Sequence, residues 1–152
     1  MVKPIPDNYP RISMYLCVDN AEDAIEFYKS VLGVDERIRY GTEDMVGHSE
    51  LTIGDSLFMV SDEFPDMGVV SPKTLGGTPC AMNVYVDDAD TTFAAALEAG
   101  ATELQPVGQR FYGDRSGKFR DPWGHRWIIS TRTENVELDE IARQAAEKMS
   151  EN

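Results

Sequence analysis

The alternation of hydrophobic and polar positions near the start of the chain predicts a strand followed by a helix. Every second residue of 12–18 is apolar, which is the pattern of a strand with one buried face. Apolar residues then recur three and four positions apart in 21–32, and this spacing predicts an amphipathic helix that packs on the apolar strand face. Asn20 or Asp19 is suited to cap the start of the helix, and Gly33 to end it.

The same order of elements returns in the second half of the chain. Val18 recurs as Val86, 68 positions later, and residues 81–100 again have the pattern of a strand, an Asp-rich turn, a helix and a final Gly. Gly54 and Gly124, 70 positions apart, each open a further strand. A repeat of supersecondary size predicts an α+β fold of two βαβββ modules.

Module boundaries follow from this repeat, and we expect one domain. The first module covers about 10–62 and the second about 80–132. The Pro- and Gly-rich segment 62–79 connects them and is long enough to act as a flap over a pocket. A C-terminal helix at about 137–150 has one apolar stripe, which needs a surface to cover.

Polar side chains gather on the strand faces that the helices leave uncovered. In residues 46–53, Leu51 and Ile53 point to the helix side, so His48 and Glu50 point to the opposite side. The repeat places two cations of the second module opposite them, Lys118 and Arg120. We therefore expect a pocket wall that holds a carboxylate, an imidazole and two cations.

Apolar and aromatic residues complete this predicted pocket. By the same alternation, Phe58 and Ile128 lie on the open faces, with Leu57 and Met59 in the core. The Gly-bracketed loop 109–117 carries aromatic and charged side chains that a solvated linker does not need. Two of them, Tyr112 and Arg115, are expected to close the mouth of the pocket. The predicted ligand-binding residues are Tyr15, His48, Glu50, Phe58, Asn83, Tyr112, Arg115, Lys118, Arg120 and Ile128.

Two alternatives stay open for these residues. His48 and Glu50 either contact a ligand or pair with Lys118 or Arg120 to satisfy a buried polar patch. The loop 109–117 either closes the cavity or packs on its own aromatic side chains.

Composition narrows the choice of partners. The chain has 27 acidic and 14 basic residues, a net charge of −13 and a pI near 4.4, which argues against nucleic acid or anionic membranes as partners. A cationic ligand and a merely soluble surface both agree with this charge. Cys17 and Cys80 lie inside strand patterns and suit a reducing compartment. No apolar run approaches a membrane span, and we expect a cytoplasmic protein.

Three segments resemble a known family: the helix 24–33, the strand and turn 48–56 and the Asp-Pro-Trp-Gly-His turn 121–125. They are similar to the vicinal oxygen chelate superfamily, over about residues 10–132. This superfamily includes glyoxalase I, extradiol dioxygenases, fosfomycin-modifying enzymes and bleomycin resistance proteins, and the chain is most similar to the PhnB-like type. The resemblance implies curled mixed sheets around a cavity and a homodimer.

The resemblance also implies where a metal is held in the metal-dependent members. There, His, Glu or Gln side chains project from the first and last strand of each module. Placing this sequence on that pattern through its repeat puts Ser13, Phe58, Ala81 and Ile128 at the four positions. None of the four is a suitable metal ligand, so we expect no metal and no other cofactor.

The sequence thus predicts a metal-independent small-molecule-binding protein that resembles bleomycin resistance proteins. Its expected role is to sequester a cationic or aromatic compound, as in antibiotic resistance. The alternative is a glyoxalase-like lyase or isomerase that uses His48 and Glu50 as catalytic residues. A third possibility is a ligand-free structural dimeric module.

Overall fold

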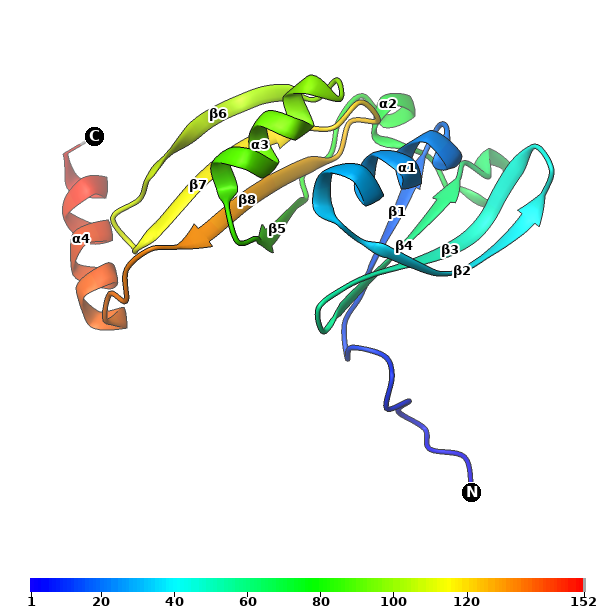
Figure 1. Cartoon of the computed structure of the whole chain (residues 1–152), viewed down its shortest axis with the longest axis horizontal. Coiled ribbons are helices and arrows are strands. Elements are labelled where there is room, and N and C mark those ends of the chain that lie inside the picture. The colour runs from blue at the N-terminus through cyan, green and yellow to red at the C-terminus, as the bar shows by residue number, and fades with distance from the viewer. Residues whose placement is uncertain (152) are drawn as a thin grey trace. The chain divides into compact units, whose positions relative to one another are not determined.

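Two four-stranded sheets with equivalent strand orders form the fold in this computed structural model, which describes residues 1–151 (Figure 1). In the first sheet the order is β1-β4-β3-β2, with β1 and β4 parallel and the other pairs antiparallel. Its elements are β1 (Met14–Val18), α1 (Ala21–Leu32), β2 (Asp35–Thr42), β3 (Met45–Ile53) and β4 (Ser56–Asp62).

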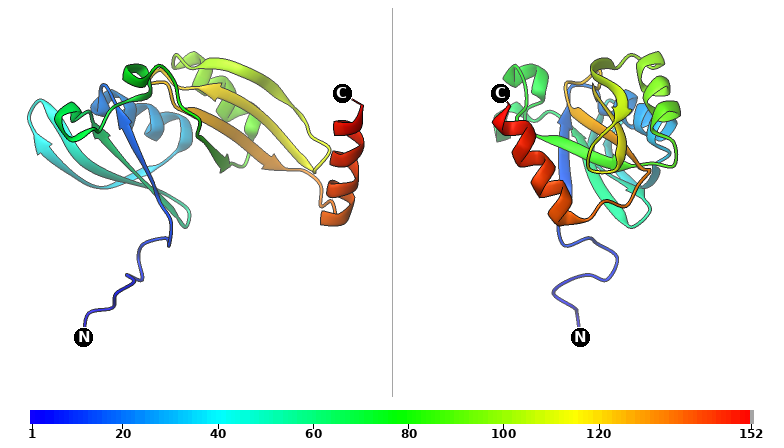
Figure 2. Two further views of the ribbon diagram at one scale, coloured as in Figure 1. Left: turned by 180° about the vertical axis from the view of Figure 1, so that it is seen from behind. Right: turned by 90° about the vertical axis from the view of Figure 1, so that its left-hand side faces the viewer.

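The second sheet repeats this plan with the order β5-β8-β7-β6. Its elements are β5 (Ala81–Tyr85), α3 (Ala89–Glu98), β6 (Thr102–Gln109), β7 (Asp114–Arg120) and β8 (Arg126–Arg132). The predicted α+β fold of two βαβββ modules is confirmed. Figure 2 shows each repeat helix lying across one face of its own sheet.

The remaining helices lie in the connection and in the tail. The connection between the modules contains the 3-10 helix η1 (Pro65–Met67) and the short helix α2 (Pro72–Leu75). The tail forms α4 (Leu138–Ser150), close to the predicted 137–150. Among the described residues, none of the helices has the length and apolarity needed to cross a membrane.

The chain divides into two compact units. The first comprises Met1–Pro79 together with Pro122–His125, and the second comprises Cys80–Asp121 and the residues from Arg126 onward. In the first unit, the Asn20 side chain accepts a hydrogen bond from the Asp23 N–H and caps α1. Gly33 ends the helix in the left-handed conformation, with φ of 68°.

The first core lies between α1 and the first sheet. Tyr28 of α1 is fully buried, and its ring meets Phe58 edge-on with 5.7 Å between centroids. Leu16, Leu51 and Val60 are buried on the same side of the sheet. The opposite face of the first sheet points away from α1 and is called the first open face below.

The second core lies between α3 and the second sheet. Phe93 of α3 packs near Phe119 of β7, with ring centroids 6.2 Å apart, and Trp127 and Ile129 of β8 are buried with them. Gly117 permits this approach, because a Cβ there would lie about 3.0 Å from the Phe93 ring. The side of this sheet away from α3 is called the second open face.

The prediction that the Phe58 side chain lies on the open face of the sheet is wrong. It packs on α1, and its neighbours Leu57 and Met59 face the other side. The error arises in the hairpins: Thr52 pairs with Leu57, but Arg120 pairs with Arg126, so the second hairpin is one residue longer. Matching the glycines of the two hairpins therefore shifts β4 by one residue, and a one-residue shift turns every side chain of a strand to the other face.

Candidate functional site

The first open face brings together side chains from three strands. Tyr15 of β1 and Glu50 of β3 both lie beside Met59 of β4 in the ladder, so all three point away from α1. His48 is two positions before Glu50 and shares its face. Residues 14–18 and 45–53 form strands here because their alternating apolar side chains are buried against α1.

A chain of hydrogen bonds links these side chains. Glu50 Oε1 accepts hydrogen bonds from the Tyr9 hydroxyl at 2.8 Å and from His48 Nε2 at 3.3 Å. Since an ionised carboxylate only accepts, Nε2 of His48 carries the proton, and in a neutral ring Nδ1 then accepts. Nδ1 lies 2.6 Å from the Tyr15 hydroxyl, which therefore donates to His48.

Arg37 compensates the charge of Glu50. Its guanidinium nitrogen lies 2.9 Å from Glu50 Oε2, and the same guanidinium lies 4.4 Å from the centroid of the Tyr9 ring. Glu50 is only 5% exposed. Burial raises its pKa, but the hydrogen bonds from Tyr9 and His48 and the charge of Arg37 outweigh burial and hold the pKa below its ordinary value.

Aromatic contacts fix the imidazole ring. Tyr40 lies directly opposite His48 in the β2–β3 ladder and stacks on it, with 5.0 Å between centroids and an interplanar angle of 28°. With both ring nitrogens hydrogen bonded and one face covered, His48 has a single orientation. Burial raises the pKa of the Tyr15 phenol, so it remains protonated near neutral pH.

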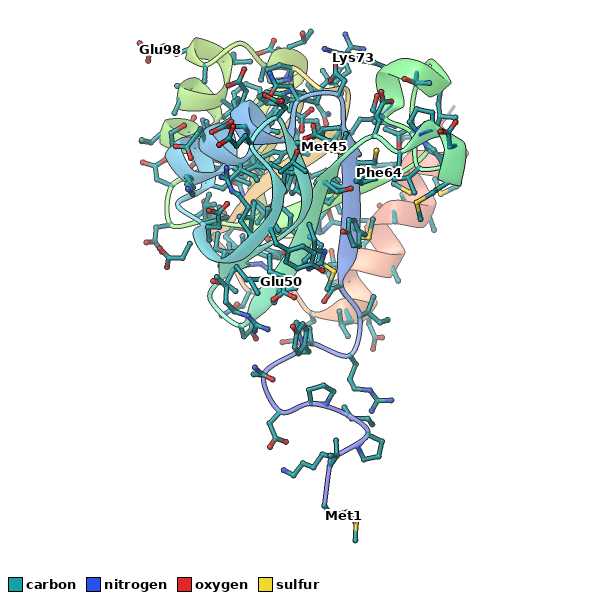
Figure 3. All side chains as sticks on the ribbon, turned by 90° about the vertical axis from the view of Figure 1, so that its right-hand side faces the viewer. Met1, Met45, Glu50, Phe64, Lys73 and Glu98 are labelled. Carbon is teal, nitrogen blue, oxygen red and sulfur yellow. The ribbon has the colours of Figure 1, made fainter. Side chains whose placement is uncertain are left out.

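A hollow of about 530 Å³ lies beside this chain of hydrogen bonds. Tyr15 belongs to the hydrogen-bond chain and also lines the hollow. The full lining is Tyr15, Cys17, Gly47, Ser61, Phe64, Met67 and Val69. Burial raises the pKa of the Cys17 thiol to about 11, so this wall is uncharged near neutral pH. Figure 3 labels Glu50 on β3 and Phe64 in the segment after β4. The hollow lies entirely within the first unit.

The segment after β4 forms one wall of the hollow and is held in place by Glu63. Phe64 and Val69 form a β-bridge with hydrogen bonds of 2.8 and 3.1 Å. Glu63 accepts hydrogen bonds from the Thr74 hydroxyl and from the Ser71 N–H. These two interactions lower the pKa of Glu63, the Thr74 bond most. The predicted flap segment is thus anchored at the start of α2.

Four predicted site residues lie on the second open face. Asn83 of β5 and Lys118 of β7 both pair with Ile128 of β8, which places all three on one face. Arg120 lies two positions beyond Lys118 on the same strand and shares the face. They belong to the second unit, whereas Tyr15, His48 and Glu50 belong to the first.

The other three predicted residues lie elsewhere. Phe58 is in the first core, as described above. Residues 114–117 belong to β7 and not to a loop, and Arg115 turns toward α3, where it forms a bidentate ion pair with Asp90. Tyr112 lies in the turn before β7 and packs edge-on against Phe111, 5.3 Å between centroids. The packing of this turn on its own aromatic rings agrees with the second of the two alternatives stated for it.

Sequence reasoning missed the partners of Glu50. Tyr9 precedes the first strand, and Arg37 lies where the β2–β3 register shifts between Glu36 and Ile38. An irregularity of this kind leaves no periodic signal. Tyr40 was missed for the same reason: the short turn at 43–44 pairs Gly41 with Val46, and a second register shift, between Tyr40 and Gly41, sets Tyr40 opposite His48.

The donor set does not fit the metal site that the fold family implies. Ser13, Ala81 and Ile128 carry no metal-binding group, and at the fourth position the open-face residue is Met59 in place of Phe58. Across residues 1–151, no group of three or more His, Cys, Asp or Glu side chains is arranged to hold a metal ion.

The sequence of this chain is similar to those of known proteins. The profile of the Glyoxalase/Bleomycin resistance protein/Dioxygenase superfamily matches residues 11–129. The uncharacterized protein Mb0911c of Mycobacterium bovis is 36% identical over 136 residues, which cover 87% of this chain and 90% of that protein.

Two solved structures are similar to this chain. The Arabidopsis thaliana gene product AT5G48480 is 28% identical with a TM-score of 0.65, over 80% of this chain and 98% of that one. Protein PA1353 of Pseudomonas aeruginosa has a TM-score of 0.68 at 23% identity, over 82% of this chain and 99% of that one, and this second likeness concerns the fold alone.

Proposed function

Because this chain belongs to the glyoxalase/bleomycin resistance protein/dioxygenase superfamily, we propose that it binds a small aromatic molecule without a metal ion. The observation that carries the proposal is the hollow of about 530 Å³ beside Tyr15. Its size lies within the range of ligand pockets, and such pockets combine apolar walls with a few placed polar groups. Phe64, Met67 and Val69 supply the apolar wall.

Tyr15 supplies the polar contact. Its proton is directed to His48 Nδ1, so its oxygen retains a lone pair for a donor on the ligand. Tyr15 is 50% exposed and lines the hollow. The preferred ligand therefore has an aromatic body and an N–H or O–H donor. His48 and Glu50 act behind Tyr15 by holding its orientation.

The charge expected of the ligand changes with this arrangement. Glu50 is nearly buried and already neutralised by Arg37, so it has no unpaired charge to offer a cation. Of the two ligand types that the sequence suggested, an aromatic compound is favoured over a cationic one. A sequestering role, as in a resistance protein, is compatible with this site because it requires tight binding and no turnover.

A fluorescence titration with N-phenyl-1-naphthylamine tests the proposal, since this neutral aromatic amine brightens in apolar surroundings. We expect saturable binding, weakened about fivefold by Tyr15→Phe because a neutral hydrogen bond is worth about 1 kcal/mol. Val69→Glu should weaken binding more than about tenfold by placing a charge in the wall. Tyr112→Phe, which removes a hydroxyl outside the hollow, is the matched control.

Two results would contradict this site. If wild-type protein does not bind the amine, the hollow is not an aromatic-binding pocket. If Tyr112→Phe weakens binding as much as Tyr15→Phe, the ligand lies under the turn at 111–113. The sequence-based expectation that Tyr112 closes the pocket would then be correct.

An enzymatic function is the second candidate, and the Tyr15–His48–Glu50 chain favours it. A phenol hydrogen bonded to an oriented imidazole can pass its proton to the ring while its oxygen accepts one from a substrate. This is the geometry that a lyase or isomerase needs. His48→Gln separates the two functions: it abolishes turnover of a substrate, but it lowers the affinity for the aromatic amine only modestly.

For assembly we propose a homodimer through α4. Leu138 and Met149 on its apolar stripe are 81% and 80% exposed, and a second copy is the commonest partner for such a surface. Light scattering should give twice the 17.0 kDa chain mass, and Leu138→Glu should return the protein to a monomer. A wild-type mass of one chain at micromolar concentration would contradict this.

A further inference from the structure

Three cations lie side by side on the second open face. Lys118 and Arg120 are two positions apart on β7 and so share a face, and Arg126 of β8 lies directly opposite Arg120. The residues between them, Phe119 and Trp127, are buried on the α3 side. Directly opposed residues of antiparallel strands have Cβ atoms about 4.5–5.5 Å apart, so Lys118, Arg120 and Arg126 form one group, called the cationic patch.

The cationic patch has no acid within ion-pair distance in the part of the chain that the structure describes. Within residues 1–151, none of its three side chains takes part in an ion pair. Other cations of the same unit do find acids: Arg115 pairs with Asp90, and Arg132 pairs with Asp114. The chain has 27 acidic residues for 14 basic ones, so a shortage of acids does not explain the unpaired charges.

Like charges placed together in this way oppose the stability of the sheet. Like charges directly opposite on neighbouring strands repel each other, and Arg120 and Arg126 stand in that relation. A local arrangement that opposes stability is typical of a functional site. An anion bound at the patch would remove the repulsion and would gain charge-assisted hydrogen bonds.

The neighbours of the patch add a donor and an apolar contact. The Ser130 hydroxyl donates to Asn83 Oδ1 at 3.0 Å, which leaves the Asn83 amide N–H groups for another acceptor. Ile128 lies directly opposite Lys118 and beside Asn83. A ligand here meets ammonium, guanidinium and amide donors next to an aliphatic side chain.

We propose that the cationic patch binds an organic oxyanion, a small molecule whose carboxylate or phosphate group lies between Arg120 and Arg126. The planar guanidinium donates two parallel hydrogen bonds to either group. Lys118 adds a third positive charge, and Ile128 contacts the organic part. This site goes beyond the aromatic-binding hollow: it lies in the other unit and recognises a negatively charged group, whereas the hollow binds a neutral aromatic body.

Calorimetric titration tests the patch with two probes, benzoate for the carboxylate and phenyl phosphate for the phosphate. We expect one of them to bind to the wild-type chain and to identify the preferred group. Arg120→Gln and Arg126→Gln should each lower that affinity by at least tenfold, about 1.4 kcal/mol. Arg143→Gln removes the same charge from an ion-paired position on α4 and should change affinity less than twofold.

A stability measurement distinguishes a binding role from a structural one. Without anions and at low salt, Arg120→Gln and Arg126→Gln should raise the melting temperature, because each relieves the repulsion across the two strands. Arg143→Gln should not raise it. Binding of the aromatic amine, which tests the first unit, should be unchanged in all three variants.

Three outcomes would overturn the proposal. Equal weakening by Arg143→Gln would mean that only net charge matters. A lower melting temperature for both patch variants would assign these side chains a structural role. Binding of a single-stranded oligonucleotide through the patch, with neither small anion bound, would make the partner a macromolecule.

Discussion

The two open faces have the same strand order but handle charge in opposite ways. On the first, Tyr9 and His48 donate to Glu50 Oε1, and Arg37 of the same unit supplies the counter-charge. On the second, Arg120 and Arg126 oppose each other, and no acid among the described residues pairs with them. Net charge is therefore a poor guide to these two faces: the chain carries −13, yet the charges that lack an ion-pair partner in this comparison are the positive ones of the second face.

The comparison depends on which residues face each core, and substitution of Phe58 tests this most strongly. Phe58→Ala should lower the free energy of unfolding by about 3–5 kcal/mol, because it leaves a cavity against Tyr28. Ile128→Ala, at the position that the glycine spacing matched to Phe58, should cost less than about 1.5 kcal/mol because Ile128 is on an open face. Urea denaturation measures both values.

Similar losses in these two variants would contradict the face assignment. The urea m-value serves as the control, since an unchanged slope shows that a shift of the midpoint reports stability and not a change in the unfolded state.

The neutralised charge on the first open face gives the next largest effect. Glu50→Gln should lower the free energy of unfolding by about 1.5–3 kcal/mol, because it removes charge-assisted hydrogen bonds and leaves Arg37 without its counter-charge. Asp90→Asn breaks the exposed pair with Arg115 and should cost much less. Thermal unfolding of both variants distinguishes the buried pair from the exposed one. Equal effects would show that Glu50 is no more important than a surface ion pair.

A smaller effect appears as a pH dependence. The folded protein lowers the pKa of Glu50 below its ordinary 4.5, so below that value the unfolded chain binds more protons than the folded one. The stability that Glu50 contributes is therefore complete above pH 4.5 and is lost as the pH falls through the lower, folded pKa. The difference in melting temperature between wild type and Glu50→Gln should shrink from pH 7 to pH 3. A constant difference would show that the charge of Glu50 is unimportant.

Most of the fold could be predicted, because hydrophobic periodicity and turn residues determine it locally. The helices at 21–32 and 89–98 begin after Asn20 and Asp88, whose side chains cap them. The same alternation placed His48 and Glu50 away from α1. It failed for Phe58 because the length of a hairpin, and not the pattern inside a strand, sets the register between strands.

The site was less predictable, because its partners come from irregular places. Arg37 lies at a register shift in β2, and Tyr9 precedes the first strand. The sequence suggested Lys118 or Arg120 as partners of Glu50, since both have the right charge. Charge alone does not specify distance, and Glu50 finds an ion-pair partner, Arg37, and a hydrogen-bond donor, Tyr9, within its own unit.

The turn 122–125 has a consequence for how the repeat can be taken apart. It joins two strands of the second sheet, yet it belongs to the first unit, where Trp123 is buried near Phe27 and the His125 ring donates to the Cys17 carbonyl. A fragment ending at Pro79 would lose the indole that closes its core. The two halves of this sequence are therefore similar in plan, but the first is complete only with a turn that the second half of the chain supplies.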